Sequence, residues 1–114
     1  LACLHRDIPA FHYMTAMFGG NNIRCSDYAT YGTQELSDLV VKALEGRSAA
    51  LMGNHGLVVL GENLQRALAL TIEAETLAKV YWRAIQVKEP ILLPDDEIAR
   101  VREKFANYVY TGRK

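Results

Sequence analysis

The segment SAALMGNHGLVVL, residues 48–60, places two short apolar runs on either side of a GNHG connection. Apolar runs of four or five residues joined by a connection of this length and composition predict a β-hairpin. Neither run alternates apolar with polar residues, so we expect both faces of the sheet to be covered. His55 lies in the turn of this hairpin, between Asn54 and Gly56.

Helical patterns flank the predicted hairpin on both sides. Thr33 is a suitable N-cap for a helix over residues 34–45, and Gly46 follows as its stop. Asn63 is a suitable cap for a long helix over residues 64–85, which carries a wide apolar face. Helices before and after the hairpin predict that the sheet is covered on both faces.

The remaining segments are predicted less directly. Residues 8–18, IPAFHYMTAMF, are interpreted as a buried strand, although a run this short is also compatible with a helix. The fifteen residues 19–33 are rich in Gly, Asn, Ser, Asp and Thr and predict a long loop. An extended connector over residues 88–94 then leads into a last helix that begins at Asp95.

Composition narrows the class of protein. The 114 residues are half apolar, which is enough for one modest domain with a packed core. Thirteen basic residues balance thirteen acidic ones, so charge gives no reason to expect a nucleic acid or an anionic membrane as a partner. Cys3 and Cys25 have no metal-binding spacing, and no apolar run approaches the roughly 18 residues that a membrane span needs. We therefore expect a cytoplasmic protein with reduced thiols.

His55 is the strongest candidate for chemistry. Gly53 and Gly56 remove bulk around its imidazole, which suits a metal ligand or a catalytic base. The alternative is that His55 is an exposed side chain in a turn that the neighbouring residues build. A catalytic zinc needs about three protein ligands, and neither His5 nor His12 forms a typical ligand pair with another histidine.

Tyrosines are the other candidates. Tyr13 follows His12 and has a phenol that can donate or accept a proton, but a half-buried core tyrosine is the commoner case. The same alternative applies to the tyrosines at the remaining positions considered, Tyr28, Tyr31, Tyr108 and Tyr110. Cys25 has no adjacent His or Lys and is assigned no nucleophilic role.

Four blocks, read together, resemble the class II aldolase/adducin family: IPAFHYM, GGNNIRCSDYATYGTQEL, ALEGRSAALMGNHGLVVLGENLQRAL and EAETLAKVYWRA. The resemblance extends over residues 1–110, and the order and spacing of the blocks make it specific. It implies that residues 1–114 are the C-terminal half of one domain of this family. The implied fold is a three-layer α/β/α sandwich with a mixed, largely antiparallel sheet, here truncated. The sequence also starts without Met, at what resembles the last turn of a helix, so we expect a fragment.

The resemblance also implies a site. The family holds zinc with three histidines, and His55 matches the third, while the other two and a catalytic carboxylate belong upstream of Leu1. Tyr13 matches a proton donor or acceptor that approaches a neighbouring subunit's site. Tyr31 matches a loop aromatic and is weaker evidence, and Tyr108 matches a tyrosine that helps to close the site.

The implied activity is cleavage of a sugar phosphate to dihydroxyacetone phosphate and an aldehyde by a zinc-dependent aldolase. The implied assembly is a homo-oligomer, a ring-like tetramer in the family. Because two ligands are missing, we expect the isolated chain to be inactive. Two alternatives stay open: a non-catalytic, adducin-like scaffold domain, and a related sugar-phosphate epimerase, dehydratase or decarboxylase.

Overall fold

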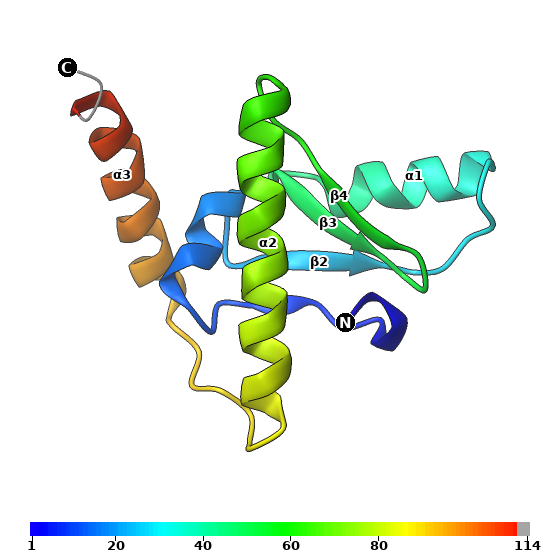
Figure 1. The fold of residues 1–114 in the computed structure, drawn as a ribbon, viewed down its shortest axis with the longest axis horizontal. Coiled ribbons are helices and arrows are strands. Elements are labelled where there is room, and N and C mark those ends of the chain that lie inside the picture. The colour runs from blue at the N-terminus through cyan, green and yellow to red at the C-terminus, as the bar shows by residue number, and fades with distance from the viewer. Residues whose placement is uncertain (112–114) are drawn as a thin grey trace.

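The computed structural model describes residues 1–111, and the side chains of residues 1–108 (Figure 1). Four strands form one sheet in the order β1-β2-β3-β4. Their bounds are Ile8–Pro9 for β1, Asn22–Ser26 for β2, Ala49–Met52 for β3 and Gly56–Val59 for β4. The pairs β1·β2 and β3·β4 are antiparallel, whereas β2 and β3 are parallel. The sheet is therefore mixed and largely antiparallel, as predicted.

The predicted hairpin is confirmed. Ala49 pairs with Val59 and Met52 pairs with Gly56, so three residues, 53–55, form the turn. The backbone N–H of His55 donates to the carbonyl of Met52 over 3.0 Å and closes this turn.

Helix α1, Gln34–Ala43, connects the parallel strands β2 and β3. Its predicted cap is confirmed, because the Thr33 hydroxyl accepts from the N–H of Leu36 over 3.2 Å. Arg24 of β2 reaches the end of this helix and donates to the carbonyls of Ala43 and Glu45, at 3.1 and 2.6 Å. Since a helix leaves its last carbonyls without partners, this arginine both satisfies them and holds α1 over its face of the sheet.

Helix α2, Leu64–Ile85, covers the opposite face, and Figure 1 shows it crossing the strands. The Asn63 side chain accepts from the N–H of Arg66 over 2.8 Å and starts the helix. The main core lies between this helix and the sheet and comprises Ile8, Phe18, Ile23, Ala49, Leu51, Leu70, Ala74 and Leu77. Because burying one Leu or Ile contributes about 1.5–3 kcal/mol, this layer dominates the stability of the fold.

Helix α3, Asp95–Thr111, packs beside the sandwich and contacts η2, Tyr13–Phe18. A second small core of Ala10, Ala16 and Ile98 lies between them, with Leu93, Val101 and Phe105 around it. The Asn21 amide donates to the Asp95 carboxylate over 2.9 Å and ties the start of α3 to the sheet.

The prediction of a strand over residues 8–18 is wrong, and the alternative of a helix is nearer to the structure. Pro9 ends β1 after two residues, because proline has no N–H for a sheet. Residues 13–18 form the 3₁₀ helix η2 instead. His12 caps it by accepting at Nδ1 from the N–H of Met14 over 3.1 Å, and Gly19 ends it with φ at +101°.

The prediction of one loop over residues 19–33 is also wrong, because β2 lies inside it. This strand is difficult to recognise in the sequence because polar Asn22 and Arg24 alternate with Ile23 and Cys25 in a segment rich in loop residues. Ile23 is fully buried against α2, whereas Arg24 satisfies the carbonyls of α1. Only the stretch after Ser26 remains irregular before α1 begins.

The first residues are helical, as expected. Ala2–Leu4 form η1, one turn of 3₁₀ helix beside strand β4. Among the residues that the structure describes, no helix has the length and apolar character needed to cross a bilayer.

Two turns pack against each other without space for side chains at Gly19 and Gly20. A Cβ atom on Gly20 would lie 2.3 Å from Cζ of Arg47, and one on Gly19 would lie 2.5 Å from the carbonyl oxygen of Gly46. Arg47 cannot easily move away, since it donates to the Asn22 carbonyl at 2.9 Å and to the Asn21 side chain at 3.1 Å. Burial lowers its pKa from the ordinary value, with repulsion from other arginines adding to this, but a guanidinium stays charged near neutral pH.

Replacing Gly20 by alanine is expected to destabilise the fold by about 1–3 kcal/mol, because the added methyl group overpacks the Arg47 guanidinium. Urea unfolding followed by circular dichroism measures the change. In an Arg47→Ala background the same substitution should cost less than about 1 kcal/mol, since the clash is gone. An equal cost in both backgrounds would contradict this account.

Candidate functional site

His55 presents its imidazole to solvent at the turn between β3 and β4. Its neighbour Asn54 has φ at +54°, in the left-handed region that asparagine tolerates better than most residues. Gly56, at φ +159°, has open space where a side chain would be. The turn therefore leaves room on the Gly56 side of the imidazole, whereas the predicted role of Gly53 in clearing this space is not seen, because His5 and Ser26 lie against it.

The turn is held in place by η1 and by His5, which follows it. The Asn54 N–H donates to the carbonyl of Ala2 over 3.0 Å, and its side-chain oxygen lies 2.5 Å from Nε2 of His5. Gly53 has no space for a side chain, because a Cβ atom would lie 2.8 Å from both His5 Nε2 and the carbonyl oxygen of Ser26. His5 and Asn54 are 49 positions apart, so no local pattern signals this contact.

The described residues do not assemble a metal site on their own. Within residues 1–111, no three His, Cys, Asp or Glu residues lie close enough together to hold a metal ion. A catalytic zinc normally takes three protein ligands and keeps one position open. The donor set around His55 is thus too small for zinc in a single copy of this chain.

Tyr13 begins η2 and is 50% exposed. Its ring stacks on His12 with centroids 5.0 Å apart and lies 6.2 Å from the ring of Phe105. These contacts fix the ring from two sides, and half of the side chain stays in reach of solvent. A phenol held in this way is available for proton transfer to a molecule outside the chain.

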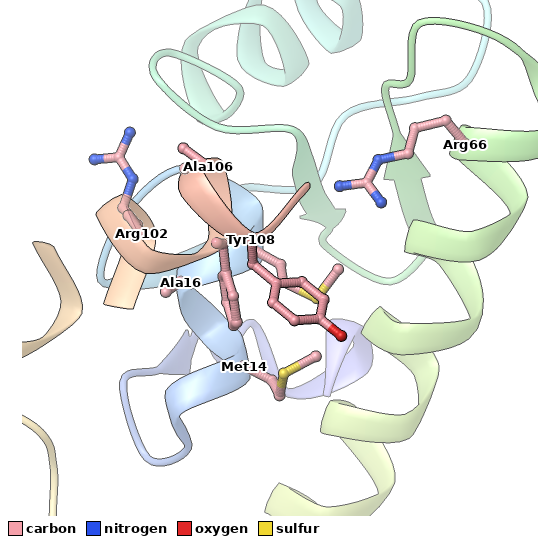
Figure 2. Close-up of a pocket in the computed structure, with 9 residues that line it drawn as sticks. Met14, Ala16, Arg66, Arg102, Ala106 and Tyr108 are labelled. Atoms are coloured by element: carbon pink, nitrogen blue, oxygen red, sulfur yellow. The ribbon is translucent and has the colours of Figure 1, made fainter. Parts of the chain in front are cut away.

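Tyr108 lies on α3 and is largely exposed. It borders a pocket of about 510 Å³ between η2, α3 and the start of α2. Figure 2 shows Tyr108 beside Met14, with Arg66 directed toward the pocket and Arg102 pointing away from it. Met17 and Phe105 complete a mainly apolar wall, so the pocket suits an apolar group with one positive side chain at its edge.

The predicted site residues fall into two separate groups. Tyr13 and Tyr108 belong to η2 and α3, which pack against each other. His55 does not join them: in Figure 1 the β3–β4 turn lies to the right of α2, whereas η2 and α3 lie to its left. A single copy therefore does not bring the imidazole and the phenols together.

The other candidate residues gain no role from the structure. Tyr28 and Tyr31 are exposed in the irregular stretch before α1. Burial raises the pKa of the Cys25 thiol, and the nearby Asp7 raises it further, so the thiol stays protonated near neutral pH. The side chain of Tyr110 lies outside the described residues.

Comparison with known proteins identifies the family. A profile described as "Class II Aldolase and Adducin N-terminal domain" matches residues 1–82. The chain belongs to this family. Two curated members are similar over 95% of the chain. One is the 5-methylthioribulose-1-phosphate/5-deoxyribulose-1-phosphate aldolase of Rhodospirillum rubrum, at 55% identity, and the other is the L-fuculose phosphate aldolase of Escherichia coli, at 48%.

The fold is also that of the class II aldolase/adducin family. A solved structure of an L-fuculose 1-phosphate aldolase matches with a TM-score of 0.88 and 45% identity, over 93% of this chain and 50% of that one. The predicted α/β/α sandwich is therefore confirmed. The chain spans about half the length of the curated relatives, 49% of the first and 51% of the second.

Replacing His5 by glycine should loosen the turn that carries His55. Glycine removes the imidazole and also relaxes the positive φ of +50° at this position, so any loosening comes from the lost contact with Asn54. Hydrogen exchange should become faster at the N–H of Asn54, which donates to Ala2. At the other end of the hairpin, the N–H of Leu60 donates to Ser48, and its exchange should not change. An unchanged rate at Asn54 would show that His5 does not hold the turn.

Proposed function

We propose that the chain is the C-terminal half of a zinc-dependent class II aldolase that cleaves a sugar phosphate to dihydroxyacetone phosphate and an aldehyde. The observation that carries this proposal is the exposed imidazole of His55 on a turn braced by η1. A scaffold has no physical need for such a histidine. The names of the two relatives, an aldolase of 5-methylthioribulose 1-phosphate and 5-deoxyribulose 1-phosphate and an aldolase of L-fuculose phosphate, support the substrate class.

The reaction needs a group that moves a proton. In a ketose 1-phosphate, the hydroxyl on C4 loses a proton as the C3–C4 bond breaks, and C4 becomes the carbonyl of the aldehyde. The electron pair of that bond passes to the three-carbon fragment, which takes up a proton at C3 to become dihydroxyacetone phosphate. We assign a proton-transfer step to the Tyr13 phenol, which is exposed and held between His12 and Phe105.

Zinc and a homo-oligomer complete the proposal. His55 would supply one ligand, and the other two ligands and a carboxylate would come from outside this chain. Because the β3–β4 turn and η2 lie on opposite sides of α2, His55 of one subunit would meet Tyr13 of another. Tyr108 would help to close that site from α3. We infer a tetramer in the cytoplasm, where free Cys3 and Cys25 stay reduced.

The isolated 114-residue chain is expected to bind zinc weakly and to lack aldolase activity, because it holds only one predicted ligand. A zinc titration against a chelator tests the binding. Enzymatic detection of dihydroxyacetone phosphate from L-fuculose 1-phosphate and 5-deoxyribulose 1-phosphate tests the activity. Full zinc occupancy together with cleavage by this chain would contradict the proposal.

A longer polypeptide, encoded by the gene with the sequence upstream of the Leu1 codon, is the positive control. An in-frame His-x-His directly upstream of the Leu1 codon would supply the two further ligands. The longer polypeptide should then contain zinc and cleave at least one of the two sugar phosphates. A longer polypeptide with neither metal nor activity would favour the scaffold alternative.

In that longer polypeptide, Tyr13→Phe is expected to lower kcat by about 10²–10⁴-fold and to change KM little, because the phenol proton is lost while the ring remains. Tyr28→Phe is the matched control, since Tyr13 and Tyr28 are 50% and 55% exposed. Steady-state kinetics of both variants give the comparison. Equal effects of the two substitutions would remove Tyr13 from the reaction.

A further inference from the structure

Helix α2 carries apolar side chains on its outward face as well as on its inner one. The inner face is buried through Leu70, Ala74, Leu77 and Tyr81. On the outward side, the side chains of Leu68, Ile72 and Trp82 are each more than half exposed. Figure 1 shows α2 as the layer nearest the viewer, with no other element in front of it.

The outward residues follow a regular spacing. Steps of four and three residues lead from Leu68 through Ile72, Glu75, Lys79 and Trp82 to Gln86. This alternation places all six side chains in one narrow stripe, the spacing at which two helices pack along their length. We call these six residues, five on α2 and Gln86 at its C-cap, the outer stripe of α2.

Around its midpoint at Leu77, the outer stripe places two opposite charges and then two large apolar side chains, whereas its outermost positions are apolar Leu68 and polar Gln86. Glu75 and Lys79 flank the midpoint, and Ile72 and Trp82 lie one step further out. Among the residues that the structure describes, neither Glu75 nor Lys79 forms an ion pair. Both charges are therefore available to a partner.

We propose that the outer stripe binds the outer stripe of a second copy of this chain, with the two helices antiparallel around a twofold axis near Leu77. In this arrangement Glu75 faces Lys79 of the second copy, and Ile72 packs against Trp82 of the second copy. A parallel pair would place like charges side by side at both positions, which is unfavourable. Antiparallel helices also align their dipoles favourably.

The size of the contact sets its strength. The 22 residues of α2 form a rod about 33 Å long at 1.5 Å per residue. Three large apolar side chains from each copy place the interface near the lower end of specific contacts, at about 1,000 Å². The dimer is therefore expected to dissociate on dilution. Glu75 and Lys79 determine that the two helices pair antiparallel, and they add little to the affinity.

Sedimentation equilibrium of the 114-residue chain over a concentration range from about 5 to 500 μM tests the association. We expect the mass to rise from one copy toward two. Ile72→Glu should remain monomeric throughout this range. Val41→Glu on α1 is the matched control, since Ile72 and Val41 are 60% and 66% exposed, and it should associate like the parent chain.

Charge reversal tests the direction of pairing. Glu75→Lys alone and Lys79→Glu alone should each weaken self-association, because like charges then meet across the twofold axis. Mixing the two variants should restore dimers, since every lysine then faces a glutamate, and this recovery cannot come from a pair within one helix. The proposal fails if the parent chain is monomeric at all concentrations. In that case the outer stripe would bind another segment or another protein. The proposal also fails if the mixture does not recover.

Discussion

The packing of Arg47 against Gly20 is the constraint on which the arrangement of the other elements depends. The guanidinium joins the turn before β2 to the turn before β3, through Asn21 and Asn22. It thereby sets two parallel strands side by side, although they come from separate parts of the chain. Asn21 in turn binds Asp95 at the start of α3. One half-buried cation thus links the turn before β3 to the segment between η2 and β2 and, through Asn21, to the start of α3.

The same framework decides what the candidate site can do. His55 is positioned by β3, β4 and η1, whereas Tyr13 is positioned by η2 and, through Phe105, by α3. Both groups are tied to a rigid core with α2 between them. A loop movement within one chain would not bring them together, because neither residue lies on a long loop. Under the proposed mechanism, His55 and Tyr13 would therefore meet only between copies of the chain.

Sequence patterns predicted the parts of the fold that local interactions decide. The caps at Thr33 and Asn63 act within three residues, so α1 and α2 could be located from the sequence alone. Strand β2 could not, because Arg24 finds its partners at the end of α1, some twenty positions away. The position of His55 in a turn was likewise predictable, but the contact of His5 with Asn54 was not, since it joins the two ends of a long stretch of chain.

The proposed pairing of α2 has a consequence for assembly. A twofold axis that makes two facing helices antiparallel lies in the interface and perpendicular to α2. Rotation about this axis places the His55 side of one copy next to the His55 side of the other copy. It also places the η2 side of one copy next to the η2 side of the other. Pairing through α2 therefore does not bring Tyr13 to His55, and completing the site needs a second, different contact. Two independent contacts on one subunit generate assemblies larger than a dimer, which is compatible with a tetramer.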